Sequence, residues 1–103
     1  MNDEVRIREA VYQAIDELND ILPPQRQLKK SPETVLYDTG GRLDSLELVN
    51  LIVTTEQNIE DEFGLPLTLA DERAMSQRNS PFRTVGSFLQ YISLLLQEQV
   101  KVA

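Results

Sequence analysis

The strongest constraint on the fold is a run of apolar residues at helical spacing that lies between a glycine pair and a single glycine. Its members recur every three or four residues, the spacing that gathers side chains on one face of an α-helix. Gly64 is a residue type that commonly ends helices, and Pro66 follows closely. The pattern therefore predicts a long helix over residues 44–63, with its apolar stripe facing a core: Leu48, Val49, Ile52, Val53, Ile59 and Phe63.

Two further segments show the same helical period. Residues 3–22 form the first predicted helix, which should end at Pro23 and Pro24 because proline cannot continue the backbone hydrogen-bond ladder. Residues 84–99 form the last, and a short helix is predicted at residues 70–77, before the Ser80-Pro81 break. The residues expected to face inward are Ile7, Val11, Ala14, Ile15, Leu18 and Leu22 in the first helix, and Val85, Phe88, Leu89, Ile92, Leu95 and Leu96 in the last.

A long connection, residues 23–43, separates the first two predicted helices. Proline, glycine, lysine and serine punctuate it, and we expect Val35, Leu36, Tyr37 and Leu43 to pin it to the core. A connection of this length is usually functional or contains a short helical turn. Residues 1–103 are therefore predicted to form one all-α domain, a small four-helix bundle with a long loop between helices 1 and 2 and a short helix 3.

The chain contains no cysteine and no histidine. That composition removes disulfides, thiolate nucleophiles, the usual zinc ligands and the commonest general base. An enzyme that uses carboxylates or lysine remains a distant alternative, and we expect neither an enzyme nor a metal site. No apolar run reaches membrane-spanning length, and the charged start MNDEVRIREA does not resemble a signal peptide. We expect a cytoplasmic, monomeric protein that does not insert into membranes.

Acidic residues dominate the charge balance, with a net charge of −7. Nucleic acid and anionic lipid surfaces would repel such a chain, whereas a protein with a basic patch would be attracted to it. The same charge can equally serve only to keep the protein in solution. Charge alone leaves these two interpretations open.

The start of the second predicted helix carries the most distinctive short segment, Asp44-Ser45-Leu46. In the simplest interpretation Asp44 caps the helix, Glu47 completes a capping box worth roughly 1 kcal/mol, and Ser45 is an ordinary first-turn residue. In the functional interpretation Ser45 carries a phosphate-linked group, which the positive end of the helix dipole favours. Glycines just upstream would keep the serine accessible, and Leu46 could offer an apolar contact.

This segment resembles the attachment motif of the acyl carrier protein family, Asp-Ser-Leu at the start of the second helix. The resemblance extends to the helix order, the long first loop and the ending TVGSFLQYI, and so covers nearly the whole chain. It implies that Ser45 carries a 4′-phosphopantetheine arm from coenzyme A, flanked by Asp44 and Leu46. The arm's thiol would hold acyl intermediates of fatty acid, polyketide or related metabolism as thioesters. The partners implied are a phosphopantetheinyl transferase and acyl-loading, acyl-transfer or synthase enzymes with basic patches.

Acidic residues on the second helix are the partner-binding groups that this resemblance implies. Glu47 matches one acidic position of the family and Glu56 lies near another, whereas Asn50 and Gln57 stand where acids are typical. The remaining acids cluster late in the helix, at Glu60, Asp61 and Glu62. This late cluster is either a solvated helix end or, together with Glu47, the group that selects the partner. The second helix and the connection after it are also longer than is usual in the family. These differences favour a specialised carrier with its own partners over the general carrier of fatty acid synthesis.

Other functions fit the residues less well. The alternative to a carrier is a non-catalytic acidic helical adaptor that binds a basic protein without a cofactor. A calcium-binding loop starting at Asp38 fails because Gly40 occupies a ligand position. Asp16, Glu17 and Asp20 could mimic catalytic carboxylates but are more simply a solvated helix face.

Overall fold

Three α-helices build the part of the chain that the computed structural model describes, residues 3–37, 43–64, 66–69 and 82–102. They are α1 (Asp3–Asn19), α2 (Ser45–Phe63) and α4 (Val85–Val102), with a 3-10 turn, η1 (Pro24–Arg26), in the first connection. The β structure within these ranges is one isolated bridge between Val35 and Thr84. The all-α prediction is confirmed, whereas the expected helix at residues 70–77 lies outside the described residues.

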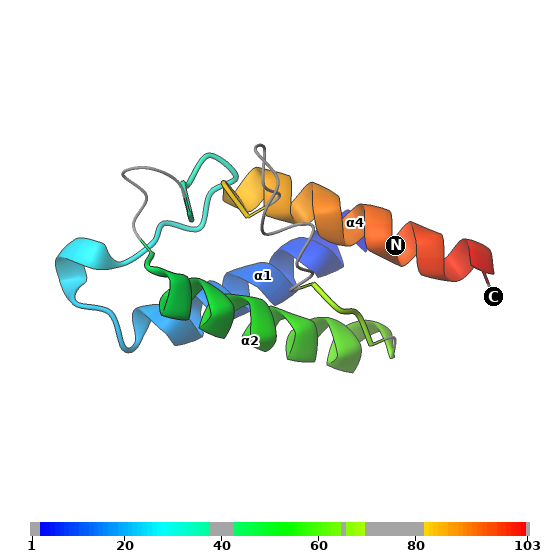
Figure 1. Cartoon of the computed structure of the whole chain (residues 1–103), viewed down its shortest axis with the longest axis horizontal. Helices are drawn as coiled ribbons and strands as arrows, with labels where there is room; N and C mark the ends of the chain where they lie inside the picture. The colour runs from blue at the N-terminus through cyan, green and yellow to red at the C-terminus, as the bar shows by residue number, and fades with distance from the viewer. Residues whose placement is uncertain (1–2, 38–42, 65, 70–81, 103) are drawn as a thin grey trace.

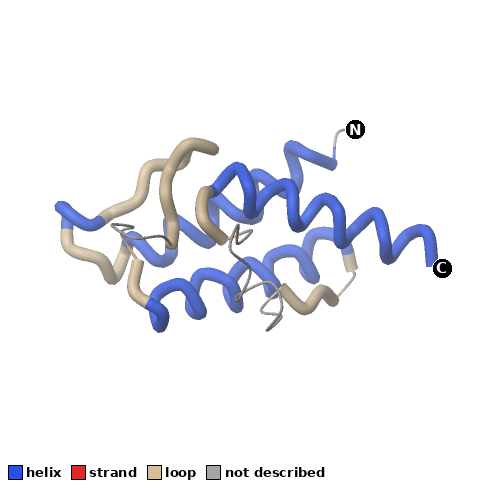
Figure 2. The backbone as a smooth tube through the Cα atoms, turned by 45° about the horizontal axis from the view of Figure 1, so that its top comes forward, coloured by secondary structure: helices blue, strands red, loops and turns tan. Residues whose placement is uncertain are grey.

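Helices α1 and α2 lie side by side and run in opposite directions (Figures 1 and 2). Arg6 near the start of α1 bonds to Glu62 near the end of α2, and the Asn58 side chain donates to the Ala10 carbonyl over 3.1 Å. The end of α1 and the start of α2 therefore lie at the same end of the molecule. Helix α4 packs chiefly against α1.

Helix α1 ends at Asn19, three residues before the predicted end. Ile21 donates to the Leu18 carbonyl and Leu22 to the Asn19 carbonyl, so the chain tightens into a turn. The Asn19 side chain accepts from the Leu28 N–H at 2.8 Å and donates to the Leu28 carbonyl at 2.9 Å. Leu22 is nevertheless buried, because the turn rather than the helix carries it into the core.

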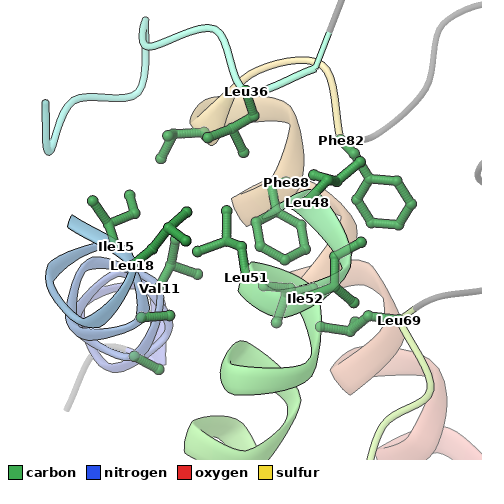
Figure 3. Packing of buried hydrophobic residues seen from close by; sticks show 14 of the residues in the cluster. Val11, Ile15, Leu18, Leu36, Leu48, Leu51, Ile52, Leu69, Phe82 and Phe88 are labelled. Carbon is green, nitrogen blue, oxygen red and sulfur yellow. The ribbon is translucent and has the colours of Figure 1, made fainter. Parts of the chain in front are cut away.

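The core gathers side chains from all three helices and from the first connection (Figure 3). All six residues expected to face inward from the first predicted helix are buried, as are Val85, Phe88, Ile92 and Leu96 of α4. In α2, the prediction holds for Leu48, Ile52 and Ile59 but is wrong for Val49 and Val53, which are 36% and 42% exposed. Leu51 and Thr55 are buried in their place, so the buried face of α2 is rotated from the predicted stripe.

The first connection is hydrogen-bonded to the start of α4. The Val85 N–H donates to the Thr34 carbonyl at 2.9 Å, and the Gly86 N–H donates to the Pro32 carbonyl at 2.8 Å. These carbonyls satisfy N–H groups that have no acceptor inside the helix. A side chain at residue 86 would place its Cβ 3.0 Å from the Pro32 oxygen, so glycine permits this close approach.

Two of the four connection residues that were expected to pack into the core are buried there. Leu36 is fully buried and Leu43 is 5% exposed, and the two are joined by a backbone hydrogen bond. The prediction is wrong for Val35 and Tyr37, which are 39% and 40% exposed. Residues alternate sides along an extended segment, so burying Leu36 turns its two neighbours outward. The connection contains one short helical turn, η1, which is one of the two features that its length suggested.

Candidate functional site at the start of α2

A reciprocal capping box closes the start of α2. The Glu47 N–H donates to Asp44 Oδ1 at 2.8 Å, and the Asp44 N–H donates to Glu47 Oε1 at 3.0 Å. Asp44 adopts the extended conformation typical of an N-cap, with φ −84° and ψ 176°. The capping box predicted from the sequence is confirmed, and it holds the backbone on both sides of Ser45.

Ser45 is the first residue of α2, at the position where the positive end of the helix dipole lies. Its neighbour Leu46 is 71% exposed, an unusual placement for a large apolar side chain beside a buried core. Leu48, two residues on, is 1% exposed and anchors the same turn in the core. The first turn is thus fixed from inside while Leu46 stays available at the surface.

Glu47 is engaged inside the protein. In addition to the Asp44 N–H, its Oε1 accepts a hydrogen bond from Arg26 Nη2, which reaches it from η1. The Glu47 side chain is only 16% exposed, compared with 41% for Arg26. The structure therefore places Glu47 in the framework around the first turn, with little of its surface left for a partner. Arg26 was not among the site residues predicted from the sequence, because no local pattern marks it.

Glu56 is also used within the fold. Its Oε2 accepts a hydrogen bond from the Leu69 N–H at 2.5 Å. Leu69 is fully buried and Leu67 is 7% exposed, so this bond fixes the segment that folds back over α2. Glu56 itself is half-buried.

The acidic cluster at the end of α2 is divided between a structural and an exposed part. Arg6 donates to Glu62 Oε1 at 2.9 Å and to the Glu62 carbonyl at 2.7 Å, and its guanidinium lies 4.2 Å from the centre of the Phe63 ring. Arg6 therefore satisfies carbonyl and carboxylate oxygens at a helix end where acids are unfavourable. Glu60 and Asp61 are exposed.

The exposed side of α2 carries an apolar strip that was not predicted from the sequence. Leu46, Val49 and Val53 follow one another at spacings of three and four residues, so they share one face of the helix. Glu60 continues the same face two turns beyond Val53. Asn50 and Gln57, also exposed, flank it. This face is therefore apolar beside Ser45 and acidic about 20 Å further along the helix.

A groove between α1 and α4 opens at the described surface, away from the capping box. It measures about 450 Å³ and is lined partly by Ile7, Arg8, Leu89 and Leu94. None of the residues of the capping box lines it. The groove and the start of α2 are thus separate features.

Within the described ranges, no cluster of three or more acidic, histidine or cysteine side chains is placed to hold a metal ion. The segment that starts at Asp38, which its sequence rules out as a calcium-binding loop, lies outside these ranges. Asp16, considered as a mimic of a catalytic carboxylate, pairs with Lys30 at 3.2 Å on the surface. No described helix combines the length and apolar character needed to cross a membrane.

No protein-family model, no curated protein and no solved structure matches this chain.

Proposed function

We propose that the protein is a carrier that holds acyl groups as thioesters on a 4′-phosphopantetheine arm attached to Ser45. The observation that carries the proposal is the position of this serine. Ser45 begins α2 directly after a complete capping box, and the next side chain, Leu46, is 71% exposed. This arrangement matches what the resemblance to acyl carrier proteins requires of an attachment site.

The chemistry of the first turn suits a phosphate ester. Capping satisfies the N–H groups of Asp44 and Glu47, while the N–H groups of Ser45 and Leu46 lie at the helix start and have no acceptor within the helix. An anion beside these groups is favoured by the helix dipole. Attachment would join the Ser45 oxygen to the phosphopantetheine phosphorus and release adenosine 3′,5′-bisphosphate from coenzyme A.

The arm would supply the reactive sulfur that the chain lacks, because the sequence contains no cysteine. The protein would then contribute attachment and presentation, and the partner enzymes would contribute catalysis. The absence of histidine is compatible with this division, since a carrier needs no general base of its own.

The exposed face of α2 is the docking surface in this proposal. Its apolar strip, Leu46, Val49 and Val53, would meet an apolar area next to the partner's active site, and Glu60 and Asp61 would meet basic residues further away. Glu47, Glu56 and Glu62 are bonded within the fold and contribute less to docking than the sequence pattern suggests.

The experiment is the intact mass of the protein after incubation with coenzyme A and a broad-specificity phosphopantetheinyl transferase. A gain equal to one phosphopantetheine group is expected for the wild type and for Ser31→Ala, a variant that removes a serine elsewhere. Ser45→Ala should show no gain. If several transferases leave the wild-type mass unchanged, the carrier assignment fails and a cofactor-free adaptor that uses the same face of α2 takes its place.

A further inference from the structure

We infer that Arg26 is a positioning residue for the modification of Ser45. The inference rests on the proposed function for its reaction and on the structure for its geometry. Arg26 lies in η1, at the end of the molecule where α1 finishes and α2 begins (Figure 1). Through Glu47 it connects the first turn of α2 to the end of α1.

One oxygen atom is the centre of this connection. Glu47 Oε1 accepts hydrogen bonds from both the Asp44 N–H and Arg26 Nη2, while the Glu47 N–H donates a hydrogen bond to the Asp44 side chain. The two bonds between Asp44 and Glu47 close a ring of backbone and side chain in which Ser45 lies. Arg26 holds the Glu47 carboxylate in place, and with it the ring that contains the serine.

The turn that carries Arg26 is itself fixed to α1. Both the N–H and the carbonyl of Leu28 bond to the Asn19 side chain, and Leu28 is 4% exposed. Gln27 adds hydrogen bonds from its amide to the Asn19 and Leu22 carbonyls, at 3.2 and 3.4 Å. Arg26 therefore reaches Glu47 from a turn that is bonded to α1, and this contact adds to the buried Leu48 in fixing the first turn of α2.

Arg26 also balances charge around the site. Asp44 and Glu47 place two carboxylates on either side of Ser45, and attachment of phosphopantetheine adds a phosphodiester, which is a third negative group. Like charges at such short range oppose one another. The guanidinium bonded to Glu47 offsets this repulsion, so its removal should slow the step that brings the phosphate to Ser45.

The test compares four proteins: wild type, Arg26→Ala, Arg26→Lys and Lys30→Ala. Lys30→Ala is the matched control, because it removes one positive charge from the same connection and a surface pair with Asp16. Two readouts are used. One is amide hydrogen exchange at Glu47 and Leu48, and the other is the kcat and KM of phosphopantetheine transfer from coenzyme A. Far-UV circular dichroism confirms that each variant is folded.

Arg26→Ala should speed exchange at the two amides by about 3- to 10-fold and lower kcat by a similar factor at an unchanged KM for the carrier. Arg26→Lys should recover most of the loss, and Lys30→Ala should match the wild type in both readouts. Addition of Glu47→Gln to Arg26→Ala should cause little further loss of kcat, because Arg26 acts through Glu47.

A change in KM alone would make Arg26 a docking contact and overturn the inference. Equal effects of Arg26→Ala and Lys30→Ala would show that only the net charge of the protein matters. That result would also overturn the inference. If the wild type itself is not modified, the proposed function fails. Hydrogen exchange then shows separately whether Arg26 stabilises the first turn of α2. Unchanged exchange rates in Arg26→Ala would contradict that role as well.

Discussion

Glu56 of α2 accepts a hydrogen bond from the backbone N–H of Leu69, and this bond holds the segment after α2 against the helix. Leu69 is fully buried beside Ile52, so the bond and the apolar contact reinforce one another (Figure 3). A half-buried carboxylate that bonds to a backbone N–H is an acid with a structural role. It explains why an acidic residue stands so close to the apolar face of α2.

Glu56→Ala should therefore destabilise the protein. Removal of the carboxylate leaves the Leu69 N–H without this acceptor, a loss of about 1–3 kcal/mol in the free energy of unfolding. Glu56→Gln retains a side-chain oxygen and should cost less. Urea denaturation followed by circular dichroism measures both. The control is Glu60→Ala, at an exposed position of the same helix, which should stay within about 0.5 kcal/mol of the wild type. Equal stability of the Glu56 and Glu60 variants would refute the structural role.

Two neighbouring residues test the orientation of α2. Ile52 is fully buried, whereas Val53 is 42% exposed. Ile52→Ala should lower the free energy of unfolding by about 2–5 kcal/mol through lost burial and a residual cavity. Val53→Ala should cost less than about 1 kcal/mol, since it removes a side chain that is largely in water. A larger loss at Val53 than at Ile52, measured by urea denaturation, would show that the buried face has been assigned to the wrong side.

The docking surface is tested at Val49, which lies one turn beyond Leu46 on the exposed strip. Val49→Asp should raise the KM for transfer of phosphopantetheine by about 10-fold, because it puts a charge where the partner offers an apolar area. The matched control is Asn50→Asp, which adds the same charge at the adjacent exposed residue without removing an apolar contact. If the two variants raise KM equally, charge rather than apolar contact governs docking.

Local patterns were enough to predict the three α-helices of the described residues. The period of apolar residues located α1, α2 and α4, and Asp44 with Glu47 identified the start of α2, because capping depends on residues close in the sequence. The period alone did not determine which side of α2 is buried. Positions 48, 49, 52 and 53 are all apolar, so either side of this stripe could face the core. The packing of Leu51 against α1 and α4 (Figure 3) determines that the side with Leu48 and Ile52 is buried.

Contacts between distant residues could not be predicted in the same way. Arg26 and Glu47 are separated by 21 positions, and Arg6 and Glu62 by 56. Neither pair produces a periodic pattern in the sequence. An exposed acidic residue and one that is bonded to a distant arginine cannot be told apart from the sequence. The role of Glu47 as part of the framework around Ser45 therefore emerged only from the fold.

The attachment of phosphopantetheine to Ser45 is tested by the mass of one tryptic peptide from the protein treated with coenzyme A and transferase. Cleavage after Arg42 and Arg73 releases residues 43–73, in which Ser45 is the only serine. We expect this peptide to gain one phosphopantetheine group, with the added mass on the fragments that contain Ser45. An unmodified peptide, or added mass located at Thr54 or Thr55, would contradict the assignment of Ser45 as the attachment site.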